Sequence, residues 1–164
     1  MKVLTKEDIK KCITMSEAIE ICKNAMKDYT LNKSVIPLRT PIQSIDNNGQ
    51  VLFMPGKIST DSDSIGIKIV SVYPDNSKLN FPAVPSTMIT INEKTGIVNG
   101  ILDGTYLTAL RTAAIQGAAT DILANKNSKI ATLIGTGGQA LEQARALVTV
   151  RELKELRVVA RNFE

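Results

Sequence analysis

Hydrophobic and polar positions follow three different patterns along this chain. After Thr14-x-x-Glu17, a capping box that marks the start of a helix, apolar residues recur every three or four positions and predict an amphipathic helix of about four turns. A weaker capping box, Thr5-x-x-Asp8, precedes it. From residue 33 the pattern changes to short extended runs between turn signals, which predicts an antiparallel or mixed sheet.

The extended region is punctuated by turn residues. Pro37 and Pro41 bias the residues before them toward extended geometry, so 35–42 is expected to be extended. Turns are predicted at 46–49, 74–76 and 93–96. Strands are predicted at 51–54, 66–72, 84–91 and 97–102, and the first of these is expected to end at Pro55-Gly56.

Helical spacing returns in a segment rich in Ala and Gly, and a different order of elements follows it. We predict a helix at 105–124, a strand at 129–134, a glycine-rich loop, a helix at 139–150 and a strand at 156–160. The last four elements form one βαβ unit. We therefore predict an α/β protein with two domains, residues 1–124 and residues 125–164, the long helix forming a bridge between them.

The loop Gly135-Thr136-Gly137-Gly138-Gln139-Ala140 is the most specific local signal. It follows an apolar strand and opens a helix, which is the context in which G-x-G-x-x-A binds a dinucleotide. The glycines permit a tight turn and a close approach of the backbone to a pyrophosphate, and the helix N-terminus offers free N–H groups. The alternative is a glycine-rich turn without a ligand.

The end of the second strand of this unit bears on the choice of cofactor. NAD-binding units place a carboxylate there for the ribose hydroxyls, but this chain carries Arg161 and Asn162. Arg161 could pair with a 2′-phosphate, which favours NADP over NAD, or it could be a surface residue.

Three cations lie in unusual sequence surroundings. Lys68 stands between Ile67 and Ile69, where a buried ammonium needs a partner, so it predicts a core ion pair, an exposed sheet face or an anion site. Arg111, within a helix, could bind a carboxylate with its planar fork or extend to solvent. Arg39 lies in the Pro-rich segment and could be a surface residue. Together the three could converge on one small anionic substrate.

Composition narrows the classes of function. The 164 residues contain no His, which excludes His-based triads and His-rich metal sites within them. Cys12 and Cys22, both in helical patterns, predict no disulfide and a reducing compartment. The net charge of +4 comes without a dense basic stripe, so no nucleic-acid surface is expected. The cations near the end of the chain predict a solvated face, with anion binding as the alternative: Arg145, Arg151, Lys154, Arg157 and Arg161.

The chain shows no signal for secretion or membrane insertion. The first residues lack the apolar core of a signal peptide, and no run of about 18 apolar residues exists. A cytoplasmic protein without a membrane partner is expected.

Several motifs in combination closely resemble one family. They are Pro37-Leu38-Arg39-Thr40, Phe53-Met54-Pro55, Gly66-Ile67-Lys68-Ile69-Val70, Ile101-Leu102-Asp103-Gly104, Thr108-Ala109-Leu110-Arg111-Thr112-Ala113-Ala114 and the glycine loop. From residue 1 to 164 the chain resembles the ornithine cyclodeaminase/mu-crystallin family. The resemblance implies an NAD(P)-dependent enzyme, an ammonia lyase or an amino-acid or imino-acid dehydrogenase. Such an enzyme acts by hydride transfer at Cα. A non-catalytic NADPH-binding protein of the mu-crystallin type is the alternative.

The same resemblance implies an architecture and a set of site residues. A mixed-sheet substrate and dimerisation domain would precede a truncated Rossmann-type nucleotide-binding domain, in a homodimer when full length. Arg39, Lys68 and Arg111 would bind the carboxylate of a small amino or imino acid. The residues implied at the cofactor are Arg111, Thr112, Gly135, Gly137, Gly138, Gln139, Ala140, Arg161 and Asn162.

Two departures from the family pattern matter. Leu52 stands where ornithine-specific members carry a Glu for the substrate amine, so ornithine itself is not the favoured substrate. Family chains are also about twice as long, and the catalytic Asp is expected beyond residue 164. The 164 residues alone are therefore expected to be an inactive fragment that binds dinucleotide weakly or not at all.

Overall fold

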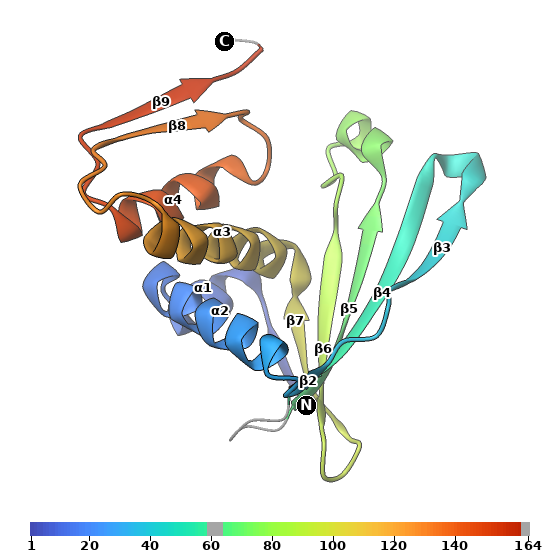
Figure 1. Cartoon of the computed structure of the whole chain (residues 1–164). Helices are drawn as coiled ribbons and strands as arrows, with labels where there is room; N and C mark the ends of the chain where they lie inside the picture. The colour runs from blue at the N-terminus through green and yellow to red at the C-terminus, as the bar shows by residue number, and fades with distance from the viewer. Residues whose placement is uncertain (59–63, 162–164) are drawn as a thin grey trace. The chain divides into compact units, whose positions relative to one another are not determined.

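The computed structural model describes residues 1–58 and 64–161 (Figure 1). Backbone contacts divide these residues into two compact units. The first unit comprises Met1–Cys12 and Lys27–Thr108, and the second comprises Ile13–Met26 and the residues from Ala109 onward. The predicted domains divide the chain at residue 124 instead. That domain boundary stays a prediction.

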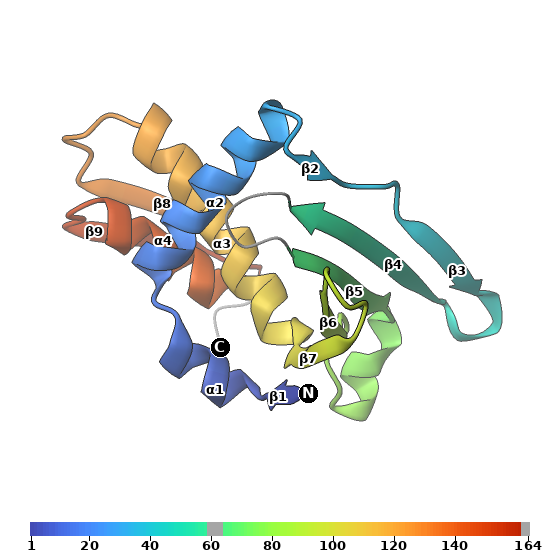
Figure 2. The same cartoon turned by 90° about the horizontal axis from the view of Figure 1, so that it is seen from below.

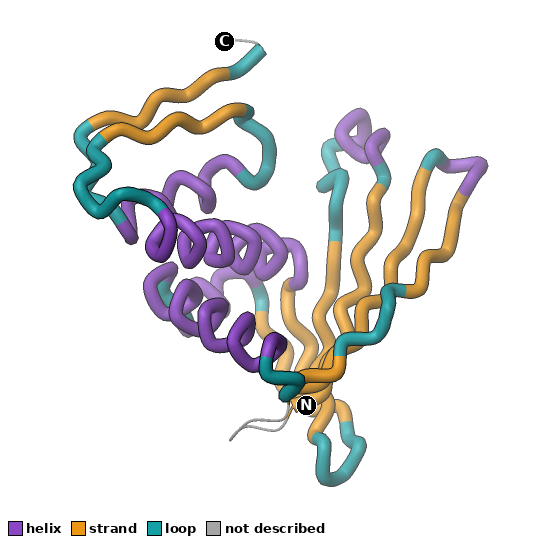
Figure 3. The backbone as a smooth tube through the Cα atoms, in the orientation of Figure 1, coloured by secondary structure: helices purple, strands orange, loops and turns teal. Residues whose placement is uncertain are grey.

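The first unit is built on a mixed sheet of seven strands, in the order β1-β7-β6-β5-β4-β2, with β3 also pairing with β4 (Figure 3). Only β1 and β7 run parallel, and every other pair is antiparallel, which confirms the predicted mixed sheet. Helix α1 packs beside β1 and β7. The bounds of these elements are β1 Lys2–Leu4, α1 Lys6–Cys12, β2 Ser34–Val35, β3 Thr40–Ser44, β4 Gly49–Ile58, β5 Ser64–Val72, β6 Ser86–Asn92 and β7 Val98–Asp103.

Strand β4 does not end at Pro55-Gly56, so that prediction is wrong. It continues to Ile58 and pairs with β5 along its whole length, including Pro55 opposite Ile67. On its other side the register with β3 ends at Phe53, and the register with β2 begins at Lys57. Pro55 therefore lies at the gap between the two partner strands, where its missing N–H costs no ladder hydrogen bond. Figure 2 shows β2 and β3 following one another along this edge of the sheet.

Both predicted capping boxes are formed. The N–H of Thr5 donates to the Asp8 carboxylate at 3.0 Å, and the N–H of Thr14 donates to Glu17 at 2.8 Å. The hydrogen bonds from Thr14 lower the pKa of the Glu17 carboxyl. Each reciprocal pair satisfies N–H groups that a helix start leaves without partners. They fix the starts of α1 and of α2, Met15–Thr30.

The second unit contains the predicted βαβ arrangement. Strands β8, Ile130–Ile134, and β9, Glu155–Val159, pair in parallel, and α4, Ala140–Val150, connects them. The C-terminal part of α3, Gly104–Leu123, also belongs to this unit. A Cβ atom on Gly117 would lie 2.8 Å from Ile19 of α2 and 3.2 Å from Ala146 of α4. The glycine thus permits close packing of three helices, which explains why most of α3 groups with β8 and β9.

No helix in the described ranges, 1–58 and 64–161, has the length and apolar character that spanning a bilayer requires.

Candidate functional site

The glycine-rich loop connects the end of β8 to the start of α4. Gly135 adopts a φ of +98°, a backbone conformation that residues other than glycine rarely adopt. Its N–H donates to the carbonyl of Val159 at 2.8 Å, which ties the loop to the end of β9. Cβ atoms placed on Gly135, Gly137 or Gly138 would meet nothing within 4 Å. The backbone of the loop therefore faces open space, as binding of a pyrophosphate at a helix N-terminus requires.

A cavity of about 530 Å³ lies between the carboxyl ends of β8 and β9. Its lining residues are Ile134, Gly135, Thr136, Gly137, Val159, Ala160 and Arg161. The structure thus places Arg161 at the same cavity as the first residues of the glycine loop. Gln139 precedes α4 as its N-cap and Ala140 begins the helix. Asn162 lies outside the described residues.

Glu142, in the first turn of α4, is a buried carboxylate that the sequence patterns do not indicate. It is 6% exposed, and Arg145 donates to it at 2.7 Å. A carboxylate in the first turn of a helix is stabilised by the helix dipole. The ion pair with Arg145 offsets its charge behind the loop, so the loop's own N–H groups remain suited to an anion.

Lys68 occupies the middle of the sheet of the first unit. It is half-buried in β5, opposite Met54 of β4 and Met88 of β6. Val70, two residues along the same face, is only 5% exposed. Lys68 is therefore not on a fully exposed sheet face.

Arg39 lies next to this position in the sheet. It is exposed and directly precedes Thr40, which pairs with Phe53. This pairing ends one residue before Met54, the residue opposite Lys68. Arg39 therefore adjoins the end of the β3–β4 pairing, while Lys68 pairs with the other side of β4.

Arg111 and Thr112 belong to the second unit. Arg111 is exposed on α3, and its carbonyl accepts a weak hydrogen bond from the Cys22 thiol at 3.9 Å. Burial raises the pKa of that thiol. Both cysteines are free, as predicted. The convergence of Arg111 with Arg39 and Lys68 stays a prediction, as do the roles of all these residues.

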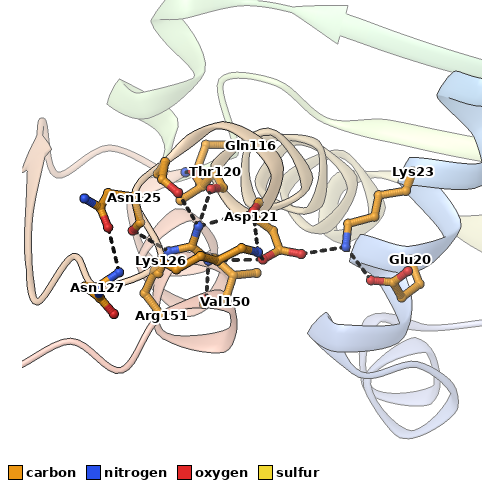
Figure 4. A network of polar contacts seen from close by, with 11 residues as sticks. Glu20, Lys23, Gln116, Thr120, Asp121, Asn125, Lys126, Asn127, Val150 and Arg151 are labelled. Atoms are coloured by element: carbon orange, nitrogen blue, oxygen red, sulfur yellow. Dashed lines mark hydrogen bonds and ion pairs between the residues drawn. The ribbon is translucent and has the colours of Figure 1, made fainter.

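Arg151 is the charged residue that sequence reasoning placed wrongly. It was expected on a solvated face, but it is 6% exposed. Its guanidinium donates to the Asp121 carboxylate at 3.1 Å and to several backbone carbonyls at the end of α3 (Figure 4). Those carbonyls belong to Thr120, Asp121, Ala124 and Asn125, and Val150 adds a further one. Arg151 therefore caps the C-terminus of α3 from the segment after α4.

Asp121 is the centre of this network. Its carboxylate also accepts from Lys23 at 2.8 Å and from Lys126 at 3.1 Å. The hydrogen bonds from Lys23, Lys126 and Arg151 hold the pKa of the Asp121 carboxyl well below its usual range. The cluster links α2, α3 and the segment after α4 within the second unit, so we interpret it as a structural network that stabilises this unit.

The described residues contain no group of three or more acidic, Cys or His side chains that could hold a metal ion. The cavity at the glycine loop is the candidate site that the described residues define. A mixed-sheet unit together with a glycine loop between a strand and a helix defines an α/β protein of the Rossmann-containing class.

Comparison with known proteins identifies the family. The model of the ornithine cyclodeaminase/mu-crystallin family matches residues 1–164, and the chain belongs to that family. A Delta(1)-pyrroline-2-carboxylate reductase of Bacillus cereus is 30% identical over 164 residues, which are 100% of this chain and 50% of that protein.

Two solved structures share both the fold and more than 30% of the sequence with this chain. The Thermococcus litoralis Delta(1)-pyrroline-2-carboxylate reductase, in complex with NADH and L-proline, superposes with a TM-score of 0.94 at 39% identity, covering 99% of this chain and 50% of that one. An archaeal alanine dehydrogenase dimer with bound NAD gives a TM-score of 0.89 at 32% identity, with 98% and 48% covered. The chain thus spans about half the length of the relatives it matches.

Proposed function

We propose that the full-length protein containing this chain is an NAD(P)-dependent oxidoreductase or deaminating enzyme of a small amino or imino acid. The observation that carries the proposal is the open cavity at the carboxyl ends of β8 and β9, formed by Gly135, Gly137 and Arg161. Doubly wound folds bind dinucleotides at this position. The similarity to reductases and dehydrogenases along the whole chain supports the proposal.

In this proposal, cofactor binding and substrate binding use different residues of the chain. The backbone N–H groups of the loop at Gly137, Gly138 and Gln139 bind the pyrophosphate. Lys68 and Arg39, with Arg111, bind the substrate carboxylate and so fix the orientation of Cα. When bound, the nicotinamide supplies the hydride chemistry.

The test is turnover by the full-length protein. It is incubated with NADPH or NADH and small cyclic imino acids, or with the oxidised cofactors and small amino acids, while nicotinamide absorbance is followed. Turnover of at least one substrate is expected. Tight NADPH binding without any turnover would instead identify a binding protein of the mu-crystallin type.

We further propose that the cofactor is NADP. Arg161 lines the cavity, and no carboxylate lies among the other described residues that line it. Arg161→Glu is expected to lower kcat/KM for NADPH at least about tenfold, since a charge-assisted hydrogen bond to a phosphate contributes roughly 1.5–3 kcal/mol. NADH should be affected much less.

Arg157→Glu is the matched control for that prediction. Arg157 lies on β9 but outside the cavity, and its exposed side chain pairs with Glu155 at 2.7 Å. This variant should keep the cofactor preference of the wild type. A wild-type protein that uses NADH and NADPH equally well would rule out the assignment to NADP.

We also propose that the full-length protein is a homodimer. The archaeal relative is described as a dimer. The sheet has two faces, and the face that does not carry Lys68 is largely apolar and only partly buried within the described residues. It carries Ile65, Ile67, Ile69, Ile89, Ile91 and Ile101. Apolar faces of this kind suit self-association. Sedimentation as a monomer at assay concentrations would contradict the proposal.

A further inference from the structure

The described neighbours of Lys68 on its own face of the sheet are uncharged and mostly apolar. Residues directly opposite one another in antiparallel strands project to the same face. Met54 and Met88 therefore flank Lys68 on the two neighbouring strands. The next positions on this face are Leu52, Val70 and Ser86 in one direction and Gly56, Gly66 and Thr90 in the other. None of these described positions carries a carboxylate.

Gly66 is needed for space, and Met88 occupies that space. A Cβ atom on Gly66 would lie 2.5 Å from Cε of Met88 and 3.2 Å from the carbonyl oxygen of Ile89. The positive-φ glycines are Gly96 and Gly135, so the backbone at Gly66 does not itself require glycine. The end of the Met88 side chain thus lies over Gly66, one row from Lys68 on the same face.

The row of residues that contains Gly66 has small side chains, which leaves space around the tip of Met88. Gly56 pairs with Gly66, and Gly100 pairs with Thr90, so small residues occupy most positions of the row. Methionine is unbranched, with three rotatable bonds, and adapts its shape to a neighbouring group. Met88 is therefore an adjustable side chain beside the ammonium of Lys68.

We propose that Met88, seated over Gly66, sets the size of the side chain or ring that the substrate carries at Cα, and that this group is apolar. The inference rests on the proposed function, in which Lys68 binds the substrate carboxylate. A carboxylate held at Lys68 brings the substituent on Cα over the same sheet face, where it meets thioethers and glycines. An ammonium group placed there would lose water without gaining a charged partner among the described positions of this face.

The first test compares substrates of two sizes in the full-length protein. Five- and six-membered cyclic imino acids are reduced by the wild type, Met88→Ala and Gly66→Ala, and the ratio of kcat/KM for the larger to the smaller is measured. Met88→Ala should raise this ratio about tenfold, because one methylene in an apolar pocket changes discrimination by roughly 10–200-fold. Gly66→Ala should lower it, since the new methyl group pushes Met88 toward Lys68.

The double variant and a neighbouring residue serve as controls. Gly66→Ala combined with Met88→Ala should return the ratio toward that of the wild type, because the added methyl group fills part of the opened space. Thr87→Ala changes the exposed neighbour of Met88 on the opposite face and should leave the ratio unchanged. Met88→Leu keeps the side-chain volume, so its ratio of kcat/KM should stay within a few-fold of the wild-type ratio. This variant keeps the test informative if Met88→Ala folds poorly.

The outcomes separate this inference from the proposed function. A wild type that turns over no small amino or imino acid, cyclic or acyclic, would overturn the proposed function. A wild type that is active, with an unchanged ratio in both single variants, would overturn the role of Met88 while leaving the function intact.

The second test addresses the apolar character of the substrate. Ornithine and norvaline have side chains of similar length, but only ornithine ends in an ammonium group. The wild type should prefer norvaline by at least about tenfold, for the desolvation reason given above. Equal efficiency with the two amino acids would contradict the apolar assignment.

Discussion

Replacing Lys68 by methionine is expected to lower kcat/KM for the amino or imino acid by about a hundredfold or more in the full-length protein. The change removes the ammonium that binds the substrate carboxylate, and hydrogen bonds to charged groups contribute roughly 1.5–3 kcal/mol each. Losing the charge also frees the orientation of Cα, which adds to the effect. Steady-state kinetics in both directions measure the loss. Affinity for the cofactor should change little, because the glycine loop belongs to the second unit.

Methionine is a suitable replacement because the fold should tolerate it. Lys68 lies between Met54 and Met88 on neighbouring strands, so a third methionine continues an apolar row. The midpoint of thermal unfolding of Lys68→Met, compared with that of the wild type, shows whether the sheet keeps its stability without this ammonium group. The result therefore separates a lost binding group from a damaged sheet.

Lys78→Met is the matched control for that experiment. Lys78 is exposed, lies in the short 3₁₀ helix Pro74–Leu79 and pairs with Asp75 at 2.6 Å. Its replacement should leave kcat/KM at the wild-type value. If Lys68→Met also kept the wild-type KM, Lys68 would not bind the carboxylate.

The parts of the fold that the sequence predicts are those set by local chemistry. Both capping boxes, the turn at Gly96 and the glycine loop depend on residues close to one another in the chain, and each forms as predicted. The βαβ unit follows in the same way, because a short apolar strand, a loop and an amphipathic helix leave few other arrangements.

The features that the sequence does not predict depend on distant partners. The course of β4 through Pro55 is possible only because two other strands end and begin beside it. β1, three residues long, is a strand only through its parallel pairing with β7. Neither condition leaves a trace in the local pattern.

The candidate site also has features that local sequence predicts and features that depend on distant partners. The glycine loop and Arg161 are predicted from their spacing around one βαβ unit, and they line one cavity. The position of Arg39 at the end of the β3–β4 pairing follows only from the register of these two strands. The role of Met88 depends on the space over Gly66, two strand positions away, and the sequence alone gives no reason to pair them.

The second large effect is expected from Arg151→Met, which should destabilise the second unit by about 3–5 kcal/mol. Removing one partner of a buried charged network is strongly destabilising, although the Asp121 carboxylate would keep its ion pairs with Lys23 and Lys126. The side chain of Arg151 is 4% exposed, and the carbonyl of Ala124 would lose its donor, while the carbonyls of Thr120 and Asn125 would keep only their backbone donors. Arg151→Lys should recover only a small part of the loss, because an ammonium cannot reproduce the planar fork.

Urea unfolding of the full-length protein, together with amide hydrogen exchange at the end of α3, measures this loss. Arg157→Met serves as the control, since Arg157 is exposed and pairs with Glu155 on the same strand, β9. A loss for Arg151→Met no larger than that for Arg157→Met would contradict the capping role.

The consequence should reach the glycine loop. The N–H of Lys154, three residues after Arg151, donates to the carbonyl of Lys129 at 2.7 Å, immediately before β8 begins. Arg151 therefore holds the end of α3 against the segment that sets the start of both parallel strands. When that cap is lost, β8 and β9 lose a common anchor, and the cavity between their carboxyl ends loses its fixed shape. Dinucleotide affinity should consequently fall in Arg151→Met, although Arg151 does not line the cavity.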